Sequence, residues 1–574
     1  MLFRSIGMAA TWDTEQIYKV SQTIAEEARA KYNDYQKRGK RGIYEGLTFW
    51  TPNINIFRDP RWGRGMETYG EDPYLTGEIG TNFIKGLQGD HEKYFKAIAT
   101  SKHYVVHSGP EPERHSFNAT TREIDFWETY MPGFIKTVQD GGAYSVMCAY
   151  NRYDGEACCG SDYLLNDLLR NKIGFDGYVV SDCGAIRDFY SGHNIVETPA
   201  EAAALGVKSG TDLNCGDVYP ALSEAVEQGL ITEKEIDVAV KRLFLARFKL
   251  GMFDAQDDVP FNDIPLSVLD KESHAEISLE TAQKSIVLLK NQNNALPLSK
   301  DLKKVAVIGP NANDPEVLLA NYNGIPSELI TPLQGIKDKL PNADVQYALG
   351  CEHAKGLPSF EVIPSENLFT DESMSQQGLK AEYFDNKELS GDPVAEQVDP
   401  NIDFYWWDKA PMESMDDDNF SVRWTGVFVP EKSGEYAFGG EGFNDFNIYL
   451  EDTLFVNFRN IHHSRKTYEF VELEANKPYE IKVEFMERHG DANMHLLWAP
   501  PKEDIEHKAL PLANESDAVI LFMGLSPRLE GEEMKVRVEG FRGGDRLTLD
   551  LPQLQKDFIK KIYNTGKPVV LVLL

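Results

Sequence analysis

The first 250 or so residues alternate short apolar runs with longer amphipathic segments. The apolar runs predict strands at residues 47–54, 97–104, 144–150, 178–182 and 211–215. Apolar residues spaced three and four apart predict helices between them, at residues 14–32, 73–87, 123–140 and 161–171. Asp72-Pro73 is a favourable helix start. This alternation predicts an α/β fold with a parallel sheet, open or closed as a barrel.

Both ends of the chain indicate interrupted elements. A closed (β/α) barrel needs about eight strands, whereas about five are predicted here, and the chain opens directly on a helix. We therefore expect the chain to start inside a domain, without its first strand–helix units. At the other end, residues 567–574 form an apolar run without a turn or cap, which predicts a buried strand cut at its tip.

The pattern changes after about residue 273. Residues 305–311 and 518–524 each predict a strand followed by a turn, and we expect both strands to belong to one α/β sheet. The segment between them differs, because from 373 to 502 the apolar residues alternate or cluster in short runs separated by Gly and Asp. Such a pattern predicts an antiparallel β domain inserted into the sheet.

Composition excludes some classes of partner and binding site. The chain has 59 basic and 91 acidic residues and a net charge of −32, which argues against nucleic acid or an anionic membrane as partner. No run of about 18 apolar residues is present to span a membrane. The six cysteines include no CxxC pair, so a zinc site is not expected. The adjacent Cys158 and Cys159 fit either one disulfide each or two free thiols.

Three polar clusters follow the predicted strands. They are Ser181-Asp182-Cys183-Gly184, Ser101-Lys102-His103 and Met147-Cys148-Ala149-Tyr150-Asn151. Parallel strands place their carboxyl ends at one edge, where barrel enzymes keep catalytic groups, so we expect one substrate pocket. The alternative for Asp182 is a cap on the next helix. The segment from Phe57 to Glu67 is dense in Arg, Trp and acids and is a further candidate for the site. The alternative interpretation of this segment is an ordinary surface loop with salt bridges.

Paired carboxylates point to glycoside hydrolysis. A retaining glycosidase uses an ionised nucleophile and a protonated acid about 5–5.5 Å apart. Asp182 suits the first role, and Leu529-Glu530-Gly531-Glu532-Glu533, after a predicted strand, offers the second. Mutual repulsion among the three glutamates raises at least one pKa. The alternative is a solvated acidic loop.

An ordered set of motifs resembles glycoside hydrolase family 3. The motifs are Arg58-Asp-Pro-Arg-Trp-Gly-Arg64, Gly70-Glu-Asp-Pro73, Lys102-His103, Met147-Cys-Ala-Tyr-Asn151, Val180-Ser-Asp-Cys183 and Val287-Leu-Leu-Lys-Asn291. The resemblance implies a TIM-like (β/α) barrel followed by an α/β sandwich, and release of single sugars from β-linked non-reducing ends with retention. It implies Asp182 as the nucleophile. It also implies a glycone pocket walled by Arg64, Lys102, His103, Met147 and Tyr150.

The inserted segment, with Gly378-Leu-Lys-Ala-Glu-Tyr-Phe384 and the stretch from Trp424 to Tyr436, is similar to the protective-antigen-type (PA-14) β domain. We therefore expect four parts. They are an N-terminally incomplete barrel at 1–255, the first part of the sandwich at 256–372, the PA-14-like domain at 373–502 and the second part of the sandwich at 503–574.

The resemblance leaves the acid/base among several glutamates. Relatives carry it in a Glu-x-Glu setting before an Asp-Arg pair, which Glu530-Gly-Glu532 and Asp545-Arg546 match across a longer loop. We rank Glu532 first, then Glu530 and Glu533, with Glu539 as an outside candidate.

The identity of the glycone is inferred indirectly. In the family an acid from the first barrel strands binds the sugar, and we expect those strands to be absent from this chain. Many family glucosidases have Trp where this chain has Cys183, and residues 114–119, 158–159 and 212–216 resemble the β-xylosidase branch. We therefore expect a β-xylosidase acting on plant-derived oligosaccharides, with β-glucosidase as the alternative and α-arabinosidase as a side activity. No cofactor or metal is expected, the oligomeric state stays open, and family analogy suggests a secreted or periplasmic protein. A non-catalytic carbohydrate-binding protein is the alternative of another class, though it has no need of a buried Asp182.

Overall fold

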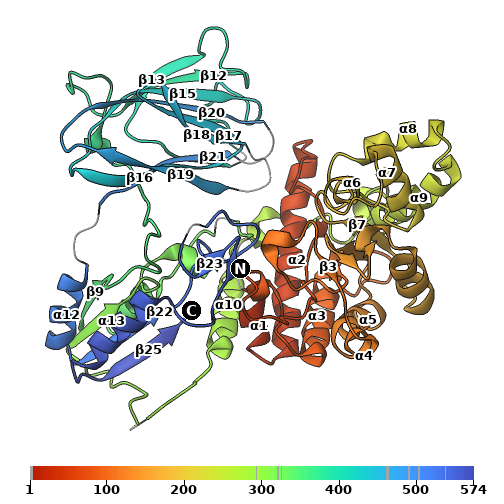
Figure 1. Ribbon diagram of the computed structural model, residues 1–574, viewed down its shortest axis with the longest axis horizontal. Helices are drawn as coiled ribbons and strands as arrows, with labels where there is room; N and C mark the ends of the chain where they lie inside the picture. The colour runs from red at the N-terminus through yellow and green to blue at the C-terminus, as the bar shows by residue number, and fades with distance from the viewer. Residues whose placement is uncertain are drawn as a thin grey trace. The chain divides into compact units, whose positions relative to one another are not determined.

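The computed structural model describes residues 4–292, 294–319, 322–324, 326–407, 409–459, 464–488, 492–501, 505–536 and 538–574 (Figure 1). The described chain forms two compact units. The first comprises Met1–Lys40, Glu45–Lys355 and Leu510–Leu574, and the second comprises Arg41–Tyr44 and Gly356–Ala509. The predicted domain boundary at residues 502 and 503 lies outside the described residues.

A four-stranded parallel sheet lies in the first unit. Its order is β1 (Thr48–Phe49), β2 (Ile98–Tyr104), β4 (Ser145–Cys148) and β7 (Tyr178–Ser181). The helices of residues 1–250 are α1 (Ser5–Ala9), α2 (Thr14–Lys37), α3 (Pro73–Gln88), α4 (Glu123–Asp125), α5 (Met131–Gln139), α6 (Asp188–Ser191), α7 (Pro199–Lys208), α8 (Leu222–Glu227) and α9 (Glu233–Lys249). Short strands β3 (Asn118–Ala119), β5 (Arg152–Tyr153) and β6 (Glu156–Ala157) form a separate small sheet.

The predicted helices of this region are present. Ile17 and Val20 of α2 are fully buried, and the Asp72 carboxylate caps α3 by accepting the Leu75 N–H at 2.7 Å. Two predicted α-helices contain π-helical turns instead, at Phe126–Tyr130 and Tyr163–Lys172. The apolar spacing therefore predicts a helix correctly without distinguishing its hydrogen-bond register.

Two predicted strands are shorter than expected. The run at 47–54 contributes only β1, because Pro52 has no N–H to offer the ladder and Asn53 forms an isolated bridge to Lys102. The run at 211–215 contributes only a bridge between Leu213 and Val180. There the carboxylate of Asp212 accepts the Val179 N–H at 2.9 Å and so occupies a ladder donor.

A second parallel sheet joins segments from both sides of the insertion, as predicted. Its order is β25 (Val569–Leu573), β22 (Ala518–Met523), β8 (Lys304–Ile308) and β9 (Asp344–Ala348). Figure 1 labels the green β9 and the blue β22 and β25 of this sheet, in which β8 lies between β9 and β22. The remaining helices are α11 (Pro332–Lys339), α12 (Glu506–Glu515) and α13 (Gln553–Tyr563), together with α10 (Glu272–Ser285), which packs against α1 and α2. The strand expected at 567–574 is confirmed as β25, but it is not buried among the described residues, because it is an edge strand and Leu571 is 42% exposed.

The second unit consists of two antiparallel sheets, as the alternating pattern predicted (Figure 1). One contains β10 (Glu361–Val362), β14 (Asp403–Trp407), β16 (Gly434–Phe443), β19 (Arg465–Leu473) and β21 (Ala492–Ala499). The other contains β11 (Leu368–Phe369), β12 (Leu379–Phe384), β13 (Ala395–Asp399), β15 (Ser421–Phe428), β17 (Asp445–Leu450), β18 (Thr453–Phe458) and β20 (Tyr479–Met486). Side chains of both sheets, among them Trp424 and Tyr436, form one apolar core.

Four of the six cysteines are paired. Disulfides join Cys148 to Cys159 and Cys183 to Cys215. Cys158 is a buried free thiol, and Cys351 is also buried. The sequence left open whether Cys158 and Cys159 form disulfides or are free thiols. Cys159 forms a disulfide and Cys158 is free.

Candidate active site

The three predicted strand-end clusters lie on neighbouring strands. In the ladder, Tyr104 pairs with Cys148 and Cys148 pairs with Ser181. Residues at the carboxyl ends of β2, β4 and β7 therefore face one edge of the sheet. Asp182 is only 7% exposed there.

One side-chain oxygen of Asp182 is hydrogen-bonded and the other has no hydrogen-bond partner. Its Oδ1 accepts the Cys183 N–H at 2.9 Å, and its buried Oδ2 has no hydrogen-bond partner. Burial raises the pKa of Asp182, as does the charge of Glu532, while Arg64 works in the opposite direction. Asp182 does not cap a helix, because α6 starts only at Asp188.

His103 lies beside this carboxylate as a neutral ring. Its Nδ1 lies 2.8 Å from Oδ1 of Asn55, an acceptor, so Nδ1 carries the proton. The other nitrogen, Nε2, accepts from Arg64 at 3.3 Å and lies 3.4 Å from Oδ2 of Asp182. Burial, reinforced by the charges of Arg64 and Lys102, holds the pKa of His103 well below its ordinary value.

Glu532 reaches the same cluster from the distant end of the chain. Its Oε1 lies 3.2 Å from Nη1 of Arg64 and accepts a short hydrogen bond from Arg114. Burial favours the neutral form, but the two guanidinium groups outweigh it and lower the pKa of Glu532 to about 2. Arg64 is itself fixed by Glu67, through contacts of 3.0 and 2.8 Å.

The other candidate glutamates have different surroundings. Burial raises the pKa of Glu530, whose charged neighbours are Arg546, Arg4 and Asp545. Glu533 is partly exposed and binds Arg114 and His115 at 2.9 and 2.7 Å. Glu539 is exposed. Of the four candidates, Glu532 is the one whose negative charge raises the pKa of Asp182.

Close backbone packing brings Glu532 to Arg64. A Cβ on Gly63 would lie 1.9 Å from the carbonyl oxygen of Gly544, and one on Gly544 would lie 2.0 Å from that of Gly531. Gly543 and Gly544 have positive φ angles and turn the hairpin of β23 (Phe541–Arg542) and β24 (Asp545–Arg546). These positions therefore require glycine.

The residues predicted to wall the glycone pocket divide into two groups. Arg64, Lys102 and His103 belong to the charged cluster, since Arg64 and Lys102 both act on the pKa of Asp182 and of Glu532. Tyr150 joins them by donating its hydroxyl to the Cys183 carbonyl at 2.9 Å and by stacking under Arg114 at 4.2 Å. Met147 instead lies in a buried apolar cluster of the sheet with Ile98, Tyr178 and Val180.

Sequence reasoning missed several partners in this cluster. Arg114, noted only within a motif, binds Glu532 and Glu533. Glu111 and Glu67 each contact one of the two guanidinium groups. Asn55 orients His103. Local sequence carries one clue, because Glu111 and Glu67 each stand three residues from their arginine.

The cystine after Asp182 changes the interpretation of Cys183. This residue stands where many family glucosidases have Trp, and its sulfur is bonded to Cys215. The Gly184 N–H also donates to the Cys215 carbonyl at 2.8 Å. The loop that follows the candidate nucleophile is therefore tied to the neighbouring strand end.

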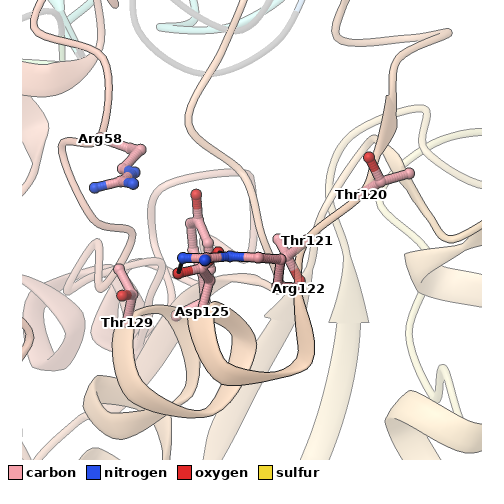
Figure 2. Close-up of a pocket in the computed structure, with 7 residues that line it drawn as sticks. Arg58, Thr120, Thr121, Arg122, Asp125 and Thr129 are labelled. Carbon is pink, nitrogen blue, oxygen red and sulfur yellow. Dashed lines mark hydrogen bonds and ion pairs between the residues drawn. The ribbon is translucent and has the colours of Figure 1, made fainter.

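A separate surface pocket of about 450 Å³ is lined by Arg58, Thr120, Thr121, Arg122, Asp125, Thr129 and Tyr130. Figure 2 shows Arg122 extending to Asp125, with Arg58 on another segment. Since Asp125 is the only carboxyl group of this lining and is paired with Arg122, the pocket lacks the two carboxylates that glycoside hydrolysis needs.

Two features are absent from the described residues. No group of three or more His, Cys, Asp or Glu side chains is arranged there to hold a metal ion. None of the helices described is both long and apolar enough to cross a membrane.

Several solved structures share the fold. A family 3 exo-β-xylosidase in complex with a xylobiose aziridine activity-based probe is 26% identical, with a TM-score of 0.67 over 99% of this chain and 53% of that chain. A β-glucosidase from Kluyveromyces marxianus is 24% identical, with a TM-score of 0.71 over 100% of this chain and 66% of that chain, which supports the fold alone.

Sequence comparison assigns the family. A xylan 1,4-β-xylosidase of Xylanibacter ruminicola is 39% identical over 99% of this chain and 66% of its own length. A β-xylosidase/α-L-arabinofuranosidase of Medicago sativa is 41% identical over 60% of this chain and 44% of its own length. The chain thus spans at most about two thirds of these relatives. Residues 1–246 match the glycosyl hydrolase family 3 N terminal domain and residues 375–509 match the PA14 domain. The chain belongs to glycoside hydrolase family 3 and carries a PA14 domain.

Proposed function

We propose that this chain carries the catalytic centre of a retaining exo-β-glycosidase that releases xylose from non-reducing ends of plant-derived oligosaccharides. The observation that carries the proposal is that Asp182 and Glu532, 350 positions apart in the chain, join one cluster: Arg64 lies 3.2 Å from Glu532 and 3.3 Å from His103, which lies 3.4 Å from Asp182. Retaining glycosidases need such a pair.

In this proposal Asp182 is the nucleophile. Its unpaired Oδ2 attacks the anomeric carbon and forms a glycosyl-enzyme ester, while the glycosidic oxygen leaves with a proton. Attack needs the ionised form, which Arg64, Arg114 and Lys102 favour against burial. Water then attacks the ester and restores the Asp182 carboxylate.

Glu532 is the proposed acid/base. Arg64 and Arg114 favour its ionised form, which is the form that removes a proton from water in the second step. The first step needs the protonated form, so hydroxyl groups of a bound sugar have to take over part of the guanidinium hydrogen bonding. Glu530 is the second choice. Its raised pKa suits an acid, but its charged neighbours are Arg546, Arg4 and Asp545 and not the groups that surround Asp182.

Arg64, Lys102, His103 and Tyr150 are the proposed glycone-binding residues. Arg64 and Lys102 are donors, whereas Nε2 of His103, which here accepts from Arg64, is an acceptor that a sugar hydroxyl would take over from Arg64. Support for Met147 is weaker, since its side chain lies in the apolar cluster.

We also propose the finer architecture. The sheet β1-β2-β4-β7, extended by the bridge from Val180 to Leu213, is part of a TIM-like barrel in residues 1–255. Residues 256–372 and 503–574 form an α/β sandwich, and 373–502 form the PA14 domain. The proposed partner is a neutral oligosaccharide.

The proposal is tested by comparing hydrolysis of an aryl β-xyloside and an aryl β-glucoside, with Asp182→Asn as control. We expect a xyloside preference that the substitution abolishes. A glucoside preference lost in the variant would keep the mechanism and replace the glycone. Activity that survives in Asp182→Asn would overturn the nucleophile, and sugar binding without hydrolysis in the unsubstituted protein would identify a non-catalytic binding protein.

A further inference from the structure

Glu111 is a buried carboxyl group beside the proposed acid/base. It begins a short 3₁₀ turn, and its side chain has 0% exposure. The Trp62 indole N–H donates to its Oε1 at 2.7 Å, and its own backbone N–H donates to Asp545 at 2.9 Å. These contacts hold Glu111 between the loop before Arg64 and the hairpin that follows Glu532.

Few positively charged groups lie close enough to stabilise an ionised Glu111. Nη1 of Arg114 lies 3.5 Å from Oε2, and Nε2 of His107 lies 4.0 Å from Oε1. His107 is neutral, because burial lowers its pKa to about 3. Its Nδ1 contacts Oδ1 of Asn151 at 3.2 Å, so Nε2 turns a lone pair and not a proton toward Glu111.

Glu111 consequently changes charge near neutral pH. Burial raises its pKa to about 7, Glu532 adds to the rise, and Arg64 and Arg114 oppose it. The same nitrogen, Nη1 of Arg114, contacts both Glu111 and Glu532. One guanidinium nitrogen is therefore shared by two carboxyl groups.

We propose that Glu111 is a positioning residue that acts through Arg114 to set how readily Glu532 holds the catalytic proton. When Glu111 is neutral, Arg114 is left to Glu532 and favours its ionised form. When Glu111 is ionised, it competes for Arg114 and adds negative charge nearby, so Glu532 binds a proton more strongly. This inference rests on the proposed function.

The test uses kcat/KM from pH 5.5 to 8.5 on two substrates, xylobiose, whose leaving group needs a proton, and an aryl xyloside with a good leaving group. The variant is Glu111→Gln, and the control is Glu113→Gln, which removes an exposed acid of the same 3₁₀ turn. On xylobiose, we expect the ratio of unsubstituted protein to Glu111→Gln to rise about tenfold between pH 6 and pH 8, equivalent to about one pKa unit at Glu532. We expect flat ratios on the aryl xyloside and for Glu113→Gln.

A second variant tests the inference in case Glu111→Gln folds poorly. Trp62→Phe removes the N–H donor that lowers the pKa of Glu111, so the inflection in the xylobiose profile should move to higher pH. A ratio constant with pH on xylobiose, an equal change on both substrates or an unmoved inflection in Trp62→Phe each overturns the inference. Activity retained in Asp182→Asn would instead overturn the proposed function itself.

Discussion

The PA14 unit and the strand-end site bury acids in opposite ways. In the PA14 unit, the buried Oδ2 of Asp399 accepts hydrogen bonds from Tyr383 and Trp424, each at 2.7 Å. At the strand ends, Oδ2 of Asp182 is buried without a partner. An unpaired buried polar atom costs about 1–3 kcal/mol. A saturated acid therefore supports a fold, whereas an unsaturated one is left available for a ligand.

The largest expected effect comes from Asp182→Asn. The substitution removes the nucleophile, and loss of such a group lowers turnover by about 10⁴-fold or more. Stability should stay within about 1 kcal/mol or rise, because the raised pKa of Asp182 means that its ionised form costs folding free energy, and Asn carries no charge. Aryl xyloside hydrolysis and denaturant unfolding measure the two effects. A clear loss of stability would make Asp182 a structural acid like Asp399.

Trp424→Ala tests the other side of the comparison. Trp424 is 0% exposed and packs against Phe404 and Trp406 in the core, so its truncation should cost about 3–5 kcal/mol of unfolding free energy. The matched control is Phe470→Ala, at a residue that is 51% exposed, with a change within about 0.5 kcal/mol. Unfolding followed by circular dichroism separates them, and equal losses would contradict the assigned core.

Glu532→Gln should have the most selective effect. Hydrolysis of xylobiose should fall about 10²- to 10³-fold, whereas an activated aryl xyloside should lose less in its first step, because only a poor leaving group needs protonation. Removing the Glu532 charge also lowers the pKa of Asp182, so the acid limb of the pH profile should move to lower pH. Glu533→Gln is the control. Equal losses on both substrates would shift the acid/base to Glu530.

Local sequence predicted most of the helices and strands and the strand-end residues, because periodicity and strand termini are local properties. It predicted the α2 face of Ile17 and Val20 and the convergence of His103 and Asp182, with Lys102 close enough to lower the pKa of Asp182. It missed what depends on distant partners. Arg114 and Glu532 are separated by 418 positions, and nothing in either neighbourhood specifies the other. The pairing of Cys183 with Cys215 was likewise hidden from spacing alone.

The closely packed glycines Gly63, Gly531 and Gly544 limit how freely segments of this chain can be exchanged. Their bare backbones interlock the segment that carries Arg64 with the one that carries Glu532. A chimera that exchanged the C-terminal segment with that of a relative would have to bring its glycines along, even where every catalytic residue matched. Recombination between relatives is therefore constrained here by backbone shape as much as by chemistry.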